Sequence, residues 1–253
     1  HAAALKHVPV VEYNPFEAVK TNVHGTQNLI EACLSNNVEF VLGVGTDKAV
    51  SPFNTYGATK LLMERLFVSA NYYKGNHNVR FSCVRYGNVL GSRGSILPTF
   101  IQQIQSGKKI TITDPEMTRF NITMNQALKL IMRAIENSRG GEVFVPKLDA
   151  FKVGDMKDAI IDLLGKNTNT ELIPVRPGEK HHEVLISKNE IRSTYENNKD
   201  YIILDTQWQE KDFETEQKIR KTSLVDEYAS NNVRLLTKNE LEDILVQEKL
   251  IGF

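Results

Sequence analysis

The sequence predicts an α/β fold, a doubly wound parallel sheet, and two observations support this prediction. Residues 38–45 (VEFVLGVG) are almost entirely apolar, which is typical of a strand buried on both faces of a parallel sheet. Helical and strand patterns also alternate through the first third of the chain. The order helix, strand, helix, strand requires crossover connections, and these place consecutive strands side by side and parallel.

The elements of this sheet domain follow in order. We expect the first helix to begin with Asn14 as its N-cap and Pro15 at the first helical position, and to end at residues 35–37. The strand at 38–45 comes next. A second helix carries Tyr56 and Lys60 and continues to Phe67, and residues 78–85 form the following strand. Residues 1–95 are therefore predicted to be the C-terminal part of a nucleotide-binding domain that carries the reactive residues.

From residue 96 the predicted elements become shorter and mixed. We expect helices at 96–105, 125–136 and 153–164 and strands at 109–113, 143–145 and 170–175. The charged segment 188–222, which contains Trp208, is predicted to be a surface excursion or a partner contact. A last helix covers 236–250, with Thr237 as N-cap and Glu240 completing a capping box. Residues 96–253 are predicted to form mainly a smaller substrate-binding lobe and a C-terminal tail.

The composition excludes several classes of function. The 253 residues include 31 basic and 31 acidic ones, so bulk charge gives no reason to expect nucleic acid or an anionic membrane as partner. No apolar run has the length of a membrane span. Cys33 and Cys83 lie in apolar runs, which predicts buried thiols in a reducing, cytoplasmic compartment.

The chemistry of the chain gathers just after the first strand. Thr46, Asp47 and Lys48 follow its carboxyl end, where open α/β sheets bind ligands. Tyr56 and Lys60 then share one helix face at spacing i, i+4. Such a phenol can take a hydroxyl proton while hydride leaves the same carbon.

Each of these motifs has a simpler alternative. Tyr195 and Lys199 repeat the spacing of Tyr56 and Lys60 in a polar stretch, and we interpret that copy as chance. Asp47 and Lys48 could be a surface ion pair, worth less than about 1 kcal/mol. The functional alternative is an acid and a base that remove water beside a new ketone. His181 and His182 suggest a metal, but no Cys or carboxylate accompanies them at a recognised ligand spacing.

Further motifs occur in order along the whole chain: residues 1–6 (HAAALK), 12–15 (EYNP), 46–49 (TDKA), Pro52, Asn54, 56–60 (YGATK), 85–89 (RYGNV), 91–95 (GSRGS), 117–120 (MTRF), 140–147 (GGEVFVPK), 176–180 (RPGEK) and 227–232 (EYASNN). Together they resemble the extended short-chain dehydrogenase/reductase family. Within it they resemble the inverting UDP-N-acetylglucosamine 4,6-dehydratases of pseudaminic acid and polysaccharide biosynthesis. The resemblance implies a Rossmann-like sheet and an NADP-dependent lyase, with NAD as the other possible cofactor.

The resemblance also implies a role for each matching residue. Thr46 would bind the sugar O4, Tyr56 would be the base for oxidation at C4, and Lys60 would hold the nicotinamide ribose and lower the Tyr56 pKa. Asp47 and Lys48 would remove water across C5 and C6. Cofactor contacts are implied at Ala3, Lys6, Asn22, Tyr56, Lys60 and Val89. Contacts with UDP-N-acetylglucosamine are implied at Asn88, Arg93, Gly94, Ser95, Arg119 and Arg176.

Three further expectations follow. A glycine-rich phosphate-binding turn is absent from the sequence, so we expect a first nucleotide-binding half to be missing before His1 and the chain alone to bind NADP poorly. The resemblance implies a homo-oligomer. The alternatives left open are a capsule-type dehydratase/5-epimerase, a UDP-sugar 4-epimerase, and an inactive fragment or interaction module.

Overall fold

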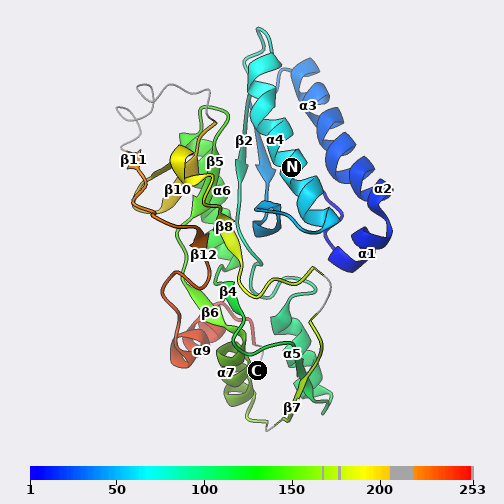
Figure 1. Cartoon of the computed structure of the whole chain (residues 1–253), viewed down its shortest axis with the longest axis vertical. Helices are drawn as coiled ribbons and strands as arrows, with labels where there is room; N and C mark the ends of the chain where they lie inside the picture. Colours follow the sequence, from blue (N-terminus) through cyan, green and yellow to red (C-terminus); the bar gives the residue numbers. More distant parts are fainter. Residues whose placement is uncertain (167, 176–177, 206–218, 252–253) are drawn as a thin grey trace. The chain divides into compact units, whose positions relative to one another are not determined.

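The computed structural model describes residues 1–166, 168–175, 178–205 and 219–251 (Figure 1). The structure divides into two units, and the polypeptide passes from one to the other more than once. Unit 1 comprises residues 1–86, 128–147 and 184–228, and unit 2 comprises 87–127, 148–183 and 229–253. A single boundary at residue 95 therefore does not describe the chain, because the later strands return to the first sheet.

Unit 1 is built on a sheet whose described strands follow the order β1-β2-β5-β10-β9-β11. β1 (Phe40–Val44), β2 (Arg80–Val84) and β5 (Val143–Pro146) are parallel. β10 (Asp200–Ile203), β9 (Thr194–Glu196) and β11 (Arg220–Lys221) continue the sheet antiparallel. The predicted α/β class with a parallel core is confirmed.

Helices cover both faces of the parallel strands. α4 (Thr55–Tyr73) packs on one face, where the ring of Phe67 fills the space beside Gly43; a Cβ on Gly43 would lie 3.2 Å from it. α3 (Gly25–Ser35) lies beside α4 (Figure 1). α6 (Met124–Asn137) packs Leu130 and Ala134 against the neighbouring strand residues Leu42 and Val44. Since successive strand residues point to opposite faces, α4 and α6 cover opposite sides.

The first predicted helix is interrupted. α1 (Val8–Tyr13) precedes α2 (Pro15–Ala18), and a π-helical segment, η1 (Val19–His24), joins α2 to α3. Asn14 stands at the N-cap position of α2 and Pro15 follows at the start of the helix, as predicted. The side chain of Asn14 makes no cap hydrogen bond and instead donates from Nδ2 to the carbonyl of Val10, 2.9 Å away.

The charged segment 188–222 also differs from its prediction. Its described part supplies η3 (Ile191–Ser193), β9, β10 and β11, and Tyr195, Glu196 and Asp200 are at most 3% exposed. It extends the sheet because buried carboxylates find distant cations: Glu196 pairs with Lys147 and Asp200 with Arg133. Trp208 lies outside the described residues.

Unit 2 has its own apolar core between α5 (Ile96–Gln105), α7 (Val153–Leu164) and α9 (Lys238–Gln247). The predicted capping box of Thr237 and Glu240 begins α9. Two small ladders complete the unit: β3 (Ile110–Ile112) with β7 (Thr170–Leu172), and β4 (Thr118–Phe120) with β6 (Ala150–Lys152). The remaining short strands are β8 (Val184–Ile186) and β12 (Tyr228–Ala229).

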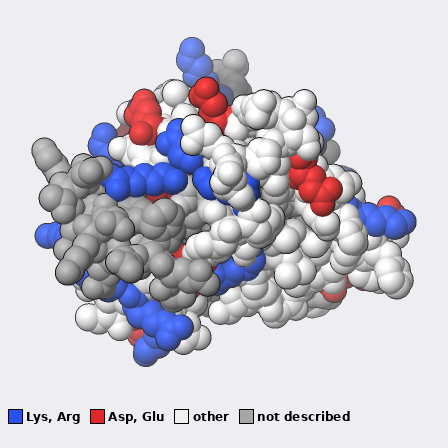
Figure 2. Space-filling model, turned by 90° about the horizontal axis from the view of Figure 1, so that it is seen from above, with Lys and Arg blue, Asp and Glu red and all other residues white. Residues whose placement is uncertain are grey.

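Other predictions can be compared directly. Cys33 and Cys83 are free, buried thiols, as expected. Every described helix is too short or too polar to cross a bilayer. On the face shown in Figure 2, basic residues lie among acidic and uncharged ones, in keeping with the equal totals of 31 and 31.

Candidate active site

The turn after β1 brings Thr46, Asp47 and Lys48 together. Asp47 begins a short 3₁₀ turn, η2 (Asp47–Ala49), and Thr46 caps it by accepting a hydrogen bond from the Lys48 amide. The amide of Asp47 donates to the carbonyl of Tyr86, which holds the turn against the chain that follows β2. The three side chains therefore occupy the end of a parallel strand, as the sequence predicts.

Hydrogen bonds link these side chains into one set. Thr46 Oγ1 donates to Asp47 Oδ1 at 2.8 Å, and Lys48 Nζ lies 3.2 Å from Oδ1 and 3.3 Å from Oδ2 of the same carboxylate. Asp47 is 3% exposed, whereas the Lys48 side chain is 23% exposed. Asp47 and Lys48 thus form a half-buried pair, so the exposed ion pair considered as an alternative does not describe them.

The start of α4 packs closely against this turn. Asn54 caps the helix by accepting from the amide of Gly57. A Cβ on Gly57 would lie 2.1 Å from the carbonyl oxygen of Lys48, so only glycine permits the approach. This close packing carries Tyr56 to the reactive set, where Lys48 and Thr46 act on its phenol.

The electrostatics of Tyr56 differ from the sequence prediction. Burial raises the pKa of Tyr56, while the ammonium of Lys48 and the hydrogen bond with Thr46 act to lower it. The cation that acts on the phenol here is thus Lys48. Lys60 was predicted to lower the Tyr56 pKa, but its Nζ donates to the carbonyl of Val44 at 2.7 Å and contacts Met63 Sδ. Burial lowers the pKa of Lys60 to about 8.

A buried ion network supports α4 beneath these residues. Arg85, 1% exposed, binds Glu64 through Nε and Nη2 at 3.1 and 2.5 Å and Glu190 through Nη1 and Nη2 at 3.2 and 2.8 Å. Glu64 lies one helical turn beyond Lys60. The sequence shows Arg85 in a motif, but its two carboxylate partners are distant in sequence and escape local pattern analysis.

The predicted cofactor residues lie in both units. In unit 1, Asn22 is 1% exposed; it accepts from the Leu5 amide and donates to the Leu5 carbonyl and to Thr59. It therefore fixes the backbone between Ala3 and Lys6, both of which are exposed. Val89 belongs to unit 2, where it pairs with Ile122.

Unit 2 contains a cavity of about 70 Å³ that brings three predicted substrate residues together: Gly94, Ser95 and Arg119. Gly94 has φ +80°, a conformation that glycine adopts readily. The carboxylates of Asp114 and Glu179 also line the cavity, and sequence analysis did not single them out.

Two other predicted substrate residues, Asn88 and Arg93, do not line this cavity. Asn88 donates weakly to Glu183, with 3.4 Å between nitrogen and oxygen. Arg93 is exposed on the loop before the cavity. Arg176 lies outside the described residues.

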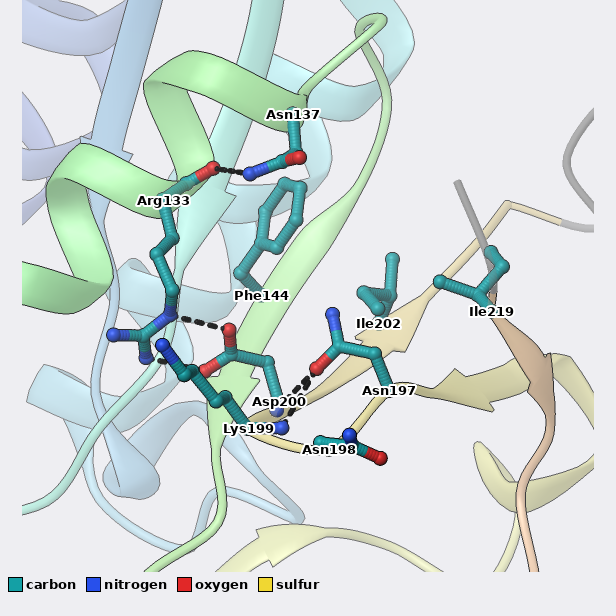
Figure 3. Close-up of a pocket in the computed structure, with 9 residues that line it drawn as sticks. All are labelled: Arg133, Asn137, Phe144, Asn197, Asn198, Lys199, Asp200, Ile202 and Ile219. Carbon is teal, nitrogen blue, oxygen red and sulfur yellow. Dashed lines mark hydrogen bonds and ion pairs between the residues drawn. The ribbon is translucent and has the colours of Figure 1, made fainter. Parts of the chain in front are cut away.

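A larger hollow of about 250 Å³ lies in unit 1 beside the turn between β9 and β10 (Figure 3). Arg133 on its wall forms a bidentate pair with Asp200, with both contacts at 2.6 Å. None of the predicted site residues lines it. Lys199 does, but its sequence partner Tyr195 lies in a strand, so this copy of the Tyr/Lys spacing shares no helix face. This placement favours the interpretation of the copy as chance.

Comparison with known proteins identifies the family. Residues 1–205 match the family model described as polysaccharide biosynthesis protein. The chain belongs to this family. Over 97% of its length it is 44% identical to a UDP-N-acetylglucosamine 4,6-dehydratase (inverting) of Campylobacter jejuni and covers 75% of that protein.

Other relatives carry different names. A protein of Methanocaldococcus jannaschii named as an uncharacterized membrane protein is 51% identical over 76% of this chain, which spans 60% of that relative's length. A UDP-glucose 4-epimerase of Rickettsia canadensis is 38% identical over 99% of the chain and 75% of the relative. Among solved structures, Pen from Bacillus thuringiensis matches with a TM-score of 0.87 and 39% identity, over 97% of this chain and 73% of that one.

Proposed function

We propose that the chain carries the catalytic and sugar-binding part of an inverting UDP-N-acetylglucosamine 4,6-dehydratase. The hydrogen-bonded set of Thr46, Asp47 and Lys48, with the phenol of Tyr56 beside it, is the observation that carries the proposal. It supplies a phenol for oxidation and an adjacent acid and amine for elimination. The product would be a UDP-2-acetamido-2,6-dideoxy-4-hexulose with inverted C5.

The residues present fit a nicotinamide cofactor. Lys60 offers a buried amine with a pKa of about 8, and the neighbouring Tyr56 phenol is 8% exposed. Lys60, Tyr56 and the backbone from Ala3 to Lys6 that Asn22 fixes would hold the cofactor, which we propose to be NADP, with NAD as the alternative. When bound, the cofactor would accept hydride from C4 and return it to C6.

The first proton movement belongs to Tyr56. The phenolate takes the proton of the C4 hydroxyl as the C4 ketone forms. Thr46 donates to the Asp47 carboxylate, and its hydroxyl is near enough to the phenol to act to lower the Tyr56 pKa. It can therefore stabilise the phenolate by turning its hydroxyl proton from Asp47 toward Tyr56.

Elimination uses Asp47 and Lys48. Transfer of one proton across the 3.2 Å contact between Lys48 Nζ and Asp47 Oδ1 converts the ion pair into a neutral amine and a carboxylic acid. The amine removes the C5 proton, made acidic by the C4 ketone, and the acid protonates the C6 hydroxyl, which leaves as water. A proton returned to the opposite face of C5 inverts that centre.

For the nucleotide, the unit 2 cavity supports a UDP-sugar ligand. Arg119 is the cation on its wall, and backbone amides near Gly94 can approach phosphate oxygens. The proposed ligand is UDP-N-acetylglucosamine, bound by a homo-oligomer in the cytoplasm.

The test uses the protein expressed from its complete reading frame, incubated with UDP-N-acetylglucosamine and NADP in D₂O. Proton NMR is expected to show a new C6 methyl group and deuterium at C5 of an inverted product. Lys60→Ala is expected to abolish turnover, whereas the matched surface variant Lys199→Ala retains it. Absence of any 6-deoxy product would contradict the proposal.

A 4-epimerase is the second candidate, favoured by the name of the Rickettsia canadensis relative. An epimerase returns hydride to C4 and has no use for an acid and base at C5 and C6. UDP-N-acetylgalactosamine as the sole product would therefore favour the epimerase over the dehydratase. A product that keeps the original C5 configuration would exclude C5 inversion while retaining dehydration.

A further inference from the structure

Unit 2 contains a continuous chain of hydrogen bonds that the proposed mechanism does not use. Asp114 Oδ2 lies 2.9 Å from Nε2 of His181, and His181 Nδ1 lies 3.1 Å from Nε2 of His182. His182 Nδ1 contacts Thr118 Oγ1 at 2.8 Å, which in turn lies 2.6 Å from Ser230 Oγ. The chain runs from the exposed Asp114 to the fully buried Ser230.

With both imidazoles neutral, the chain has one arrangement of protons. The Asp114 carboxylate only accepts, so His181 donates to it from Nε2 and its Nδ1 accepts from His182 Nε2. His182 Nδ1 must then accept from the Thr118 hydroxyl, and Thr118 accepts from Ser230. Every donor therefore points toward Asp114.

One added proton reverses the inner part of the chain without breaking it. His181 then donates from both nitrogens, so His182 accepts at Nε2 and donates from Nδ1 to Thr118. Thr118 donates to Ser230, and the Ser230 hydroxyl turns to the Thr118 carbonyl oxygen, 3.2 Å away. Both protonation states are fully hydrogen-bonded. The added charge lies on His181, next to the Asp114 carboxylate.

A second proton is disfavoured by like charge. Burial lowers the pKa of His182, and His181 and Arg119 lower it further, while Asp114 acts in the opposite direction. A charge on His181 therefore disfavours a charge on His182. The charged groups near the pair are Asp114 and Arg119, with Glu179 and Glu183 beside Arg119, and Lys180 precedes His181 in the sequence. Glu116 pairs with Lys152 at 2.7 Å.

The chain is joined to Arg119 through its backbone. Arg119 Nη1 donates to the carbonyls of Thr118 at 2.8 Å and His181 at 3.1 Å, so two members of the chain orient the guanidinium. Arg119 is one cation near three carboxylates: Glu179 at 3.5 Å, Glu183 at 3.6 Å, and Asp114 on the same cavity wall. One proton on the histidine pair would therefore reduce the negative charge that an anionic ligand meets at this wall.

We propose that His181 and His182 hold one proton within the chain of hydrogen bonds from Asp114 to Ser230, and that this proton strengthens the binding of a diphosphate at Arg119. The two histidines are positioning residues, since they act through Arg119 and the cavity wall. The inference rests on the proposed function, because it assigns the diphosphate of a nucleotide sugar to this cavity.

Two measurements on the whole protein test the inference. The first is an NMR titration of the imidazole rings, in which His181 and His182 are expected to show two separated macroscopic steps. In His182→Gln, His181 is expected to titrate in a single step. Thr118→Val removes the hydroxyl link but keeps both rings, and it is expected to shift the titration of His182. His77→Gln removes an exposed histidine of unit 1 and is expected to leave these curves unchanged.

The second measurement is calorimetric binding of UDP-N-acetylglucosamine, whose diphosphate is esterified at both ends and does not titrate near neutral pH. Affinity is expected to rise about fivefold from about pH 8 to about pH 5.5 in the wild type, as expected for one charge added in a partly screened site. The rise is expected to be lost in His182→Gln and kept in His77→Gln.

The outcomes separate this inference from the proposed function. Binding whose pH dependence is the same in wild type and His182→Gln, or rings that titrate independently, would overturn the inference and leave the proposed ligand standing. Coupled rings without any binding of UDP-N-acetylglucosamine would instead overturn the assignment of that ligand, and the linkage to the diphosphate with it.

Discussion

The buried network of Arg85 gives the sharpest test of how α4 is held in place. Arg85→Leu removes five hydrogen bonds to Glu64, Glu190 and the Leu185 carbonyl. Glu64 is 1% exposed and would keep a buried carboxylate without its cation. Breaking a buried pair by removing one partner typically costs 3–5 kcal/mol, so we expect the free energy of unfolding to fall by about 4 kcal/mol.

A surface pair provides the matched control. Arg234 binds Asp149 through two contacts at 3.2 and 2.6 Å, but its side chain is 57% exposed. Arg234→Leu is expected to cost much less stability than Arg85→Leu, because exposed pairs gain little over hydration. The double variant Glu64→Leu/Arg85→Leu is expected to lose less free energy of unfolding than Arg85→Leu alone, because it also removes the buried carboxylate of Glu64.

Urea unfolding followed by far-ultraviolet circular dichroism measures these differences. The comparison is valid where the variants share the wild-type m-value, since a changed slope would indicate a changed unfolded or native state. If Arg85→Leu and Arg234→Leu lose the same stability within about 1 kcal/mol, burial does not decide the strength of these pairs and the reasoning fails.

Three further predictions concern the active site and its support. Asp47→Asn is expected to slow formation of the 6-deoxy product at least about 100-fold, measured by NMR, because it removes the general acid; unchanged turnover would exclude that role. Gly57→Ala is expected to lower the free energy of unfolding by about 3 kcal/mol, since its Cβ would meet the Lys48 carbonyl at 2.1 Å; Gly25→Ala, with its nearest neighbour at 3.6 Å, should cost nothing. The pKa of Glu190 lies below its ordinary value of about 4.5: burial raises it, but Arg85 and the hydrogen bonds from Ser187 together lower it by more. Its stabilising contribution is therefore present above about pH 4.5 and lost as the pH falls below that value. In Glu190→Gln, the free energy of unfolding measured in urea should therefore depend less on pH below that value.

Sequence patterns placed the elements whose signals are local. The apolar run at 38–45 gave β1, and the boundaries of α5 and α7 match the predicted helices at 96–105 and 153–164. The strands β9 and β10 could not be found in this way. Their buried carboxylates, Glu196 and Asp200, make the segment look exposed, and the cations that neutralise them lie 49 and 67 residues away in sequence. Burial of charge becomes acceptable only when such a partner is present.

The same limit applies to the reactive residues. Spacing of i, i+4 correctly places Tyr56 and Lys60 on one helix, but it cannot decide which cation acts on the phenol. The long side chain of Lys60 donates to the carbonyl of Val44 at the end of β1. Lys48, in the turn after β1, contacts Asp47 and acts to lower the pKa of Tyr56. A shared helix face thus fixes the direction in which a side chain leaves the backbone and not the group that its charged end meets. In the proposed mechanism, Asp47 and Lys48 therefore place the groups for elimination beside the phenol that serves the oxidation.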